Sequence, residues 1–292
     1  MNVLIIDMTH GGTLIASEFS DQPDFNVFAL DIYNTLSEEK KKSLTQKGIK
    51  SVEKEFLDNI NIKNNVKNLS NDDFLIVAPI HCNINSKIHL THHEAVNFLM
   101  KNEIKVPVIE VTGVKGKTSV VWMLKEIFIE NNPLILSSLG IEVIKNMENY
   151  ILEHDISITP ANIINTWKLG KDFNPQICIF ETSLGGTGLA DVGIITNIAE
   201  NYPVASGEKN ACLAKAQMFK SKITACDFDS FNNYYSTINK KVNTFGLNDK
   251  ANVHATDIKF ELDKTMFTAK IENLETYEGD LLNTEFEVET FA

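Results

Sequence analysis

A glycine-rich segment that carries two lysines and two hydroxyl side chains lies near the middle of the chain, and it reads Val111-Thr112-Gly113-Val114-Lys115-Gly116-Lys117-Thr118-Ser119. Glycines allow successive backbone N–H groups to face an anion at the start of a helix. Lys117 would then reach the outer phosphates of a nucleotide, and the Thr118 hydroxyl would bind Mg²⁺. Val111 stands where the general phosphate-loop pattern has its first glycine. The alternative is an ordinary helix N-terminus with incidental glycines.

A second polar segment follows the apolar run Ile177-Cys178-Ile179-Phe180 and begins with Glu181. A carboxylate at the end of a buried strand lies where α/β sheets bind their ligands, so Glu181 could complete a Mg²⁺ site begun by Thr118. The loop Gly185-Gly186-Thr187-Gly188 could cover a substrate closely. Alternatively, Glu181 only caps the turn that follows it.

Four of the five histidines in the first third of the chain are candidates for the site, and three of these four lie at expected strand ends or helix starts. The four are His10, His81, His92 and His93. They could contact the acidic groups of a substrate or a metal that the substrate itself carries. The alternative is that they are helix caps, turn residues or hydrogen-bonded core residues. Adjacent residues of a helix point in different directions, so we expect at most one of His92 and His93 to face a substrate.

Short apolar runs alternate with helical patterns along most of the chain. The runs cover residues 3–6, 27–30, 74–77, 106–111, 133–136, 177–180 and 192–195. This rhythm predicts βα units and mostly parallel sheets. A glycine turn at residues 9–12 follows the first run, although the full dinucleotide-binding fingerprint is absent. From about Val253 the pattern changes to alternating strands, as at residues 258–262 and 286–290.

We therefore predict an α/β protein of two domains, which suits a chain of 292 residues. The first, residues 1–103, is a Rossmann-like substrate-binding domain, and the second, residues 104–292, is an ATP-binding domain. The sequence stops directly after a strand without a polar tail, which is typical of a truncation.

Composition limits the possible partners. A net charge of −12 argues against broad binding to nucleic acid. The four cysteines lie far apart without a CxxC pair, so neither a zinc ribbon nor a disulfide framework is expected. The N-terminus lacks the basic and apolar regions of a signal peptide, and no stretch is long enough to span a membrane. We expect a reducing, cytoplasmic location, and the oligomeric state stays open.

The two polar segments, with Thr159-Pro160 between them and Ile195-Thr196-Asn197-Ile198 after them, resemble the central domain of Mur ligases and folylpolyglutamate synthetases. The resemblance implies ATP at the glycine loop and Mg²⁺ at Glu181. It also implies that Lys215, in Leu213-Ala214-Lys215-Ala216-Gln217-Met218-Phe219, is a carbamylated lysine that supports a second Mg²⁺. Judged alone, Lys215 would be a solvated helix lysine.

The N-terminal motifs are similar to those of the branch of this family, found in methanogens, that cyclises a nickel tetrapyrrole. They are Ile6-Asp7-Met8-Thr9-His10-Gly11-Gly12, Asp31-Ile32-Tyr33, Ala78-Pro79-Ile80-His81 and His92-His93-Glu94-Ala95-Val96. The resemblance implies that ATP activates a propionate of a nickel seco-tetrapyrrole and that a ring carbon attacks it. Two departures are Glu200-Asn201-Tyr202, where amide-forming members have an Asp-His pair, and the apparent absence of the usual third domain.

The resulting hypothesis is an ADP-forming ligase that uses ATP and Mg²⁺ on a small carboxylic acid, a nickel tetrapyrrole, with neither nucleic acid nor a membrane as partner. An amide-forming ligase acting on a cell-wall or folate-like acid, and a nucleotide-binding protein without turnover, are the alternatives. Lys117, Glu181 and Lys215 are the expected catalytic residues, and Thr118 and Glu181 the metal ligands. The expected ATP-binding residues are Gly113, Val114, Lys115, Gly116, Lys117, Thr118, Ser119 and Asn197. The expected substrate-binding residues are His10, Gly11, Gly12, His81, His92, His93, Thr159, Ser183, Gly185 and Gly186.

Overall fold

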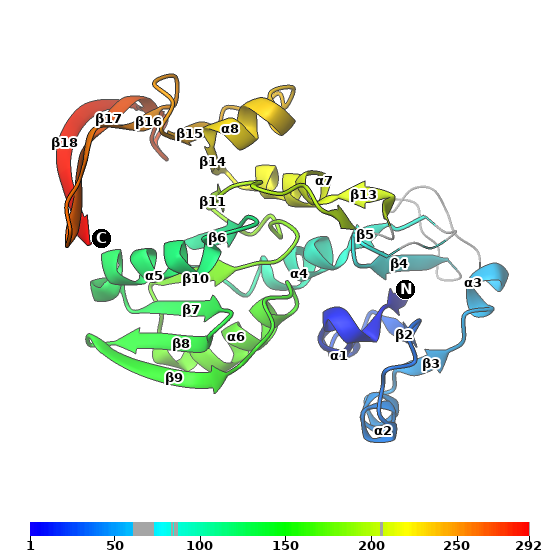
Figure 1. Ribbon diagram of the computed structural model, residues 1–292. Helices are drawn as coiled ribbons and strands as arrows, with labels where there is room; N and C mark the ends of the chain where they lie inside the picture. The colour runs from blue at the N-terminus through cyan, green and yellow to red at the C-terminus, as the bar shows by residue number, and fades with distance from the viewer. Residues whose placement is uncertain (61–72, 83, 85–86, 205–206, 292) are drawn as a thin grey trace.

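The computed structural model describes residues 1–60, 73–82, 84, 87–204 and 207–291. Two large sheets follow one another along the chain, and Figure 1 shows them with their helices. The first sheet contains strands from residues 2–91, and the second contains strands from residues 108–291. The predicted α/β class with parallel sheets is confirmed.

The first sheet has five parallel strands in the order β3-β2-β1-β4-β5. The strands are β1 (Asn2–Ile6), β2 (Asn26–Leu30), β3 (Lys50–Val52), β4 (Phe74–Ala78) and β5 (Leu90–Thr91). The helices are η1 (Met8–Gly12), α1 (Thr13–Ser20), α2 (Glu38–Gln46), α3 (Phe56–Asn59) and α4 (His92–Met100). Because the strand order reverses direction between β1 and β4, the carboxyl ends of these two strands border a topological switch point, where open α/β sheets bind ligands.

The second sheet has eleven strands in the order β18-β17-β16-β15-β14-β11-β6-β10-β7-β8-β9. Its parallel part contains β6 (Val108–Thr112), β7 (Pro133–Ser137), β10 (Ile177–Glu181), β11 (Val192–Ile195), β14 (Ile223–Asp227) and β15 (Asn243–Gly246). The remaining strands are β8 (Gly140–Lys145), β9 (Glu148–His154), β16 (Val253–Phe260), β17 (Lys264–Glu275) and β18 (Leu281–Phe291). A separate antiparallel pair joins β12 (Pro203–Val204) to β13 (Lys209–Asn210).

Helices cover both faces of the parallel part. They are α5 (Lys117–Ile127), η3 (Ile129–Asn131), α6 (Asn162–Gly170), η4 (Lys171–Phe173), α7 (Ala211–Lys215), η6 (Ala216–Lys220), α8 (Phe228–Ser230) and η7 (Phe231–Tyr235). Side chains of β10 alternate between the faces: Ile177 and Ile179 share a core with Val121 of α5, whereas Cys178 and Phe180 share another with Ile163 of α6. This period of two explains why β10 is apolar at successive positions, as a strand buried on both faces must be.

One hydrophobic core continues from the first sheet to the second, since it contains Val3 of β1, Val96 of α4 and Phe180 of β10. Polar contacts cross the same boundary. Thr91 Oγ1 donates to Gln217 Oε1 at 2.9 Å, and Lys220 Nζ pairs with Glu94 Oε1 at 2.7 Å. The start of α4 therefore lies against the segment around η6.

The structure has an antiparallel pair of strands, β8 and β9, between β7 and β10, where the sequence predicted only helical patterns. This prediction was wrong. Five of the six residues of β8 are buried, and β8 pairs with β7 on one side and β9 on the other. The turn between β8 and β9 places Asn146 and Met147 at positive φ (52° and 64°). A turn with two positive φ values usually contains glycine, so the non-glycine pair concealed the hairpin.

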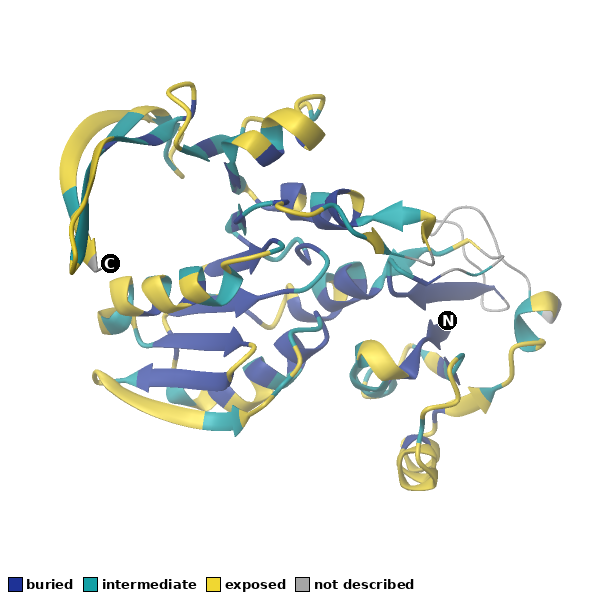
Figure 2. Cartoon of the chain, in the orientation of Figure 1, coloured by how far each residue is buried: buried dark blue, intermediate teal, exposed yellow. Residues whose placement is uncertain are grey.

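The parallel strands β6, β7 and β10 are buried along their whole length, whereas the antiparallel strands β16, β17 and β18 are mostly half-buried or exposed, as Figure 2 shows. The change of pattern predicted from about Val253 is confirmed by these three strands. The four cysteines are free thiols in buried positions. Among the described residues, none of the helices is both long and apolar enough to cross a membrane.

Candidate functional site

The predicted phosphate loop connects β6 to α5 at the carboxyl edge of the second sheet. Gly116 caps the start of α5 with φ = 80°, a left-handed conformation that favours glycine. Gly113 lies against Thr196, and a β-carbon at this position would collide with the Thr196 hydroxyl. Lys117 and Thr118 are the first two helical residues, and Ser119 follows on an exposed position. The loop therefore lies between a strand and a helix N-terminus, the place that the sequence predicted for it.

The loop backbone is held by the segment after β11. Val114 N donates to Asn197 O at 2.9 Å, and Lys115 N donates to Asn197 Oδ1 at 3.2 Å. The Lys115 carbonyl accepts from Asn197 Nδ2 at 3.0 Å and from Thr196 Oγ1 at 2.6 Å. Asn197 was expected among the ATP-binding residues, and its side chain bonds the loop at Lys115.

Glu181 ends β10, the strand next to β6, and its carboxylate meets the start of α5. Thr118 Oγ1 lies 3.2 and 3.1 Å from the two carboxylate oxygens, and Lys117 Nζ lies 4.0 Å from Oε1. Ser138 contributes its backbone N–H at 3.1 Å to Oε2 and its hydroxyl at 3.1 Å to Thr118 Oγ1. This group of hard oxygen donors fits Mg²⁺, which prefers carboxylate and hydroxyl oxygens.

Lys215 ends the short helix α7 and is almost fully buried, with 1% of its surface exposed. Burial, with a smaller contribution from the positive charge of Lys117, lowers the pKa of Lys215 to about 8. A solvated helix lysine is therefore not what the structure contains. A buried amine with a lowered pKa is the kind of lysine that reacts as a neutral nucleophile.

His10, His81, His92 and His93 line one small cavity of about 80 Å³ between the two sheets. The other lining residues are Pro79, Ile80, Thr159, Pro160, Ser183 and Leu184. The predicted substrate residues Thr159 and Ser183 therefore lie beside the histidines, and Ser183 lies two residues beyond Glu181. This cavity adjoins the segment that carries the oxygen-donor group.

His92 and His93 point to different partners, as the helix geometry predicts. His92 Nε2 lies 3.0 Å from Ile6 O in the first sheet, and His93 Nε2 lies 2.8 Å from Ser183 O in the second. Burial lowers the pKa of each to about 4, so both rings are neutral near pH 7. A neutral imidazole donates from one nitrogen only, so the bond to Ser183 O fixes the tautomer of His93. His92 has a second carbonyl, His10 O, 3.3 Å from its Nδ1, and a neutral ring can donate to only one of its two carbonyls.

Each of the four glycines that were expected to contact the substrate packs closely against other atoms of the protein. A β-carbon on Gly11 would meet Ala161, and one on Gly12 would meet the Asp7 carbonyl. Gly185 lies against the Ala214 carbonyl, and Gly186 lies against the Glu110 carboxylate. Close packing alone is therefore sufficient to explain these glycines, and their contact with a substrate stays a prediction.

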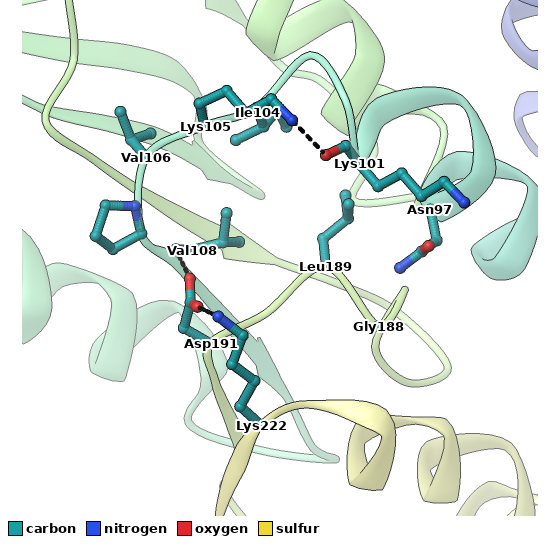
Figure 3. Close-up of a pocket in the computed structure, with 11 residues that line it drawn as sticks. Asn97, Lys101, Ile104, Lys105, Val106, Val108, Gly188, Leu189, Asp191 and Lys222 are labelled. Carbon is teal, nitrogen blue, oxygen red and sulfur yellow. Dashed lines mark hydrogen bonds and ion pairs between the residues drawn. The ribbon is translucent and has the colours of Figure 1, made fainter. Parts of the chain in front are cut away.

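A larger pocket of about 470 Å³ lies at the opposite edge of the second sheet, and Figure 3 shows its lining. It surrounds Val108 at the amino end of β6, where Asp191 accepts from Val108 N at 2.8 Å and pairs with Lys222 at 2.5 Å. Ligands of α/β sheets bind at the carboxyl ends of strands. We therefore do not place the nucleotide in this pocket.

Several residues of the site were not assigned roles from the sequence. Ser138 and Thr196 follow the strand ends of β7 and β11, which is the signal that could have identified them. Asp7 follows β1 in the same way and accepts a 2.6 Å contact from His10 Nδ1. Glu110 had no such signal, because it lies inside the strand β6.

Two curated proteins are similar to this chain in sequence. The chain is 30% identical over 233 residues to coenzyme F(430) synthetase of Methanosarcina acetivorans, covering 73% of this chain and 46% of the relative. It is 29% identical over 245 residues to coenzyme F(430) synthetase of Methanocaldococcus jannaschii, covering 82% and 55%. The chain thus spans about half the length of the curated relatives it matches. A comparison with protein-family models finds no match.

A solved structure of UDP-N-acetylmuramoyl-L-alanyl-D-glutamate–2,6-diaminopimelate ligase has a similar fold. Its TM-score is 0.51 at 15% identity, and the similarity covers 91% of this chain and 52% of that structure. At this identity the likeness concerns the fold alone. The chain therefore has the Mur ligase fold and is, by sequence, a partial-length relative of the coenzyme F(430) synthetases.

Proposed function

We propose that this chain provides the ATP-binding and acid-binding parts of an ADP-forming ligase. The observation that carries the proposal is the convergence of Lys117, Thr118 and Glu181 at one edge of the second sheet. The sequence relatives named coenzyme F(430) synthetase support the same conclusion. The phosphate loop would hold ATP, with Lys117 at the outer phosphates.

The proposed reaction begins when a substrate carboxylate oxygen attacks the γ-phosphorus of ATP and releases ADP. A carboxylate is a poor electrophile, and its acyl phosphate is a good one because phosphate is a competent leaving group. Lys117 and the N–H groups at the start of α5 would stabilise the negative charge that develops on the phosphoryl oxygens. Thr118 and Glu181 would hold Mg²⁺, which supplies further neutralisation of the phosphate charge.

Lys215 is the proposed carbamylated lysine of the site. Carbamylation joins the neutral amine to CO₂ and releases a proton, so a lowered pKa favours it. The product is a carboxylate, which would relieve the repulsion between Lys215 and Lys117. A carbamate signal in ¹³C NMR after addition of ¹³C-bicarbonate, absent in Lys215→Arg, is the expected result.

The proposed acid is a propionate of a nickel seco-tetrapyrrole. In the second step a ring carbon attacks the acyl phosphate, a carbon–carbon bond forms, phosphate leaves, and the attacking carbon loses its proton. Since nucleophile and electrophile belong to one molecule, no amine site is needed. His10, His81 and the cavity beside Ser183 are the proposed surroundings of the acid.

The test is ADP release by the full-length gene product with ATP and Mg²⁺. One sample receives the nickel seco-tetrapyrrole acid without an amine, and another receives UDP-sugar acids with amino acids. ADP release that depends on the tetrapyrrole alone is the expected result. Release only with an acid and an amine would replace the proposal with an amide-forming ligase, and ATP binding without any release would indicate a nucleotide-binding protein.

A further inference from the structure

Three potential metal ligands converge at the switch point of the first sheet. Asp7 follows β1, His10 lies in the helix η1 directly after it, and His81 follows the adjacent strand β4. One ligand atom from each residue lies within 4.8 Å of the other two. Asp7 Oδ2 is 2.6 Å from His10 Nδ1 and 3.5 Å from His81 Nε2. None of these atoms belongs to the Thr118 and Glu181 group.

We propose that Asp7, His10 and His81 form a binding site for a divalent first-row transition-metal ion. Two imidazole nitrogens and one carboxylate oxygen form a ligand set that suits Zn²⁺, Co²⁺, Ni²⁺ or Fe²⁺ better than Mg²⁺, which prefers oxygen ligands. Three protein ligands leave at least one coordination position for water or a substrate oxygen. The proposal goes beyond the proposed function and does not depend on it.

The backbone of Asp7 supports a dedicated role for its carboxylate. Asp7 has φ = 70° and ψ = 88°, a left-handed conformation that is uncommon for residues other than glycine. Its second oxygen, Oδ1, accepts from Thr9 N at 3.0 Å and from His10 N at 3.2 Å. These bonds fix the carboxylate so that Oδ2 faces both histidines. The residue is fully buried, and a buried carboxylate requires compensating partners.

The ring of His81 supplies a second, independent observation. Within the described residues, both of its nitrogens are buried and neither makes a hydrogen bond. The 3.5 Å between Nε2 and Asp7 Oδ2 is longer than a well-formed hydrogen bond. Buried polar atoms without partners are uncommon, because they lose their contact with water and gain nothing in return. A metal ion bound between Asp7 Oδ2 and His81 Nε2 would give His81 Nε2 the partner that it lacks.

Other ligand classes fit the triad less well. An anion such as phosphate, bound to the triad with no cation beside it, would be repelled by the buried carboxylate of Asp7. The nickel of a tetrapyrrole offers one axial position on each face of the macrocycle, so it could accept one imidazole but not three converging side chains. The His10 and His81 rings lie edge to face with centroids 4.8 Å apart, and each has a nitrogen within 3.5 Å of Asp7 Oδ2. A free ion is therefore the occupant that uses all three residues.

The experiment measures metal binding by the whole chain without an affinity tag. The protein is treated with a chelator and then titrated with Co²⁺ or Zn²⁺ in excess Mg²⁺, which occupies sites built from oxygen ligands. Elemental analysis after dialysis gives the stoichiometry, and the visible absorption of Co²⁺ reports nitrogen and oxygen ligation. We expect one ion per chain and a rise in the melting temperature on metal addition.

Single substitutions test the three ligands. His81→Ala, His10→Ala and Asp7→Asn should each weaken binding at least about a hundredfold, since even residues that only support metal ligands contribute about 10- to 100-fold. His154→Ala is the matched control, because His154 is exposed and lies outside the triad. His81→Ala removes no hydrogen bond, so the metal-free variant should melt close to the wild-type temperature.

Three results would overturn the proposal. The first is the absence of a retained ion, and the second is equal binding by the wild type and His81→Ala. The third is binding of a nickel tetrapyrrole, but of no free ion, with a change in nickel absorption that disappears in His81→Ala. That outcome would assign the imidazole to the substrate's own metal.

Discussion

The side-chain amide of Asn197 binds both peptide groups of Lys115. Its Oδ1 accepts from Lys115 N at 3.2 Å, and its Nδ2 donates to Lys115 O at 3.0 Å. Oδ1 also accepts from Ala199 N at 3.3 Å, which fixes the orientation of the amide. The segment after β11 thereby fixes the phosphate loop from outside the loop.

Replacing Asn197 by Ala should weaken ATP binding roughly tenfold, because the loss of two hydrogen bonds to the loop releases the backbone that faces the phosphates. Titration calorimetry with ATP and Mg²⁺ measures the effect. Asn233→Ala, at an exposed position of η7, is the control and should bind as the wild type does. Equal affinity of Asn197→Ala and the control would show that the loop keeps its shape without the amide.

Replacing Lys117 by Met should reduce ATP affinity by about 10- to 100-fold, the range expected for the loss of a charged hydrogen bond to phosphate. Methionine keeps most of the aliphatic length, so the packing of α5 should be preserved and the melting temperature nearly unchanged. Lys171→Met, on an exposed position of η4, controls for the loss of one positive charge. An equal loss in both variants would point to the overall charge of the protein instead of a specific contact.

Thr118→Val and Glu181→Gln should each remove the Mg²⁺ dependence of ATP binding. Valine has nearly the shape of threonine but no oxygen donor, and glutamine is neutral and a weaker ligand. Both residues are linked in the structure by the Thr118 hydroxyl at 3.1–3.2 Å from the carboxylate. The measurement is ATP affinity over a range of Mg²⁺ concentrations. A variant that still responds to Mg²⁺ as the wild type does would place the metal elsewhere.

The sequence predicted the elements that have strong local patterns. The apolar run before Gly113 and the helical pattern after Thr118 were found as β6 and α5, and Glu181 was found at the end of β10. Each of these depends on residues within a few positions of one another. The hairpin β8–β9 was missed because its turn lacks glycine and because its apolar residues also suit a helix.

Contacts between distant segments could not be predicted in the same way. Ser138 reaches Glu181 across 43 positions of the chain, and His93 reaches Ser183 across 90. The burial of Lys215 depends on the packing of α7 against the rest of the fold, whereas its sequence environment only indicated a helix. The sequence assigned no role to Asp7. Its contact with His81 depends on the pairing of β1 with β4, two strands that lie far apart in the sequence.

Glu110 leads to a prediction about the pH dependence of stability. Its side chain is fully buried inside β6, and burial raises its pKa to about 7, although hydrogen bonds from Thr187 act in the opposite direction. Thr187 N donates to Glu110 Oε2 at 2.7 Å, and the Thr187 hydroxyl bonds the other oxygen. Glu110 therefore anchors the loop of residues 185–188 with a carboxyl group that exchanges its proton near neutral pH.

The native state binds this proton more tightly than the unfolded chain, in which the pKa is close to 4.5. Its contribution to stability is therefore complete below about pH 4.5 and is lost as the pH rises through about 7. Glu110→Gln imitates the protonated form at every pH. The melting temperature of this variant minus that of the wild type should increase from pH 5 to pH 7.5 and then stay constant. Each kcal/mol of unfolding free energy that the wild type loses should add about 2–4 °C to this difference.

The difference between the two proteins isolates Glu110, because groups that titrate in both cancel. His92 and His93 are the most relevant of these groups. Because burial lowers their pKa values, they destabilise the folded protein as the pH falls, which is opposite to the effect of Glu110. Thermal unfolding of both proteins in the same buffers at four or more pH values is sufficient. A constant difference across the range would mean that Glu110 keeps one protonation state throughout, and that the loop is anchored by a carboxylate at all of these pH values.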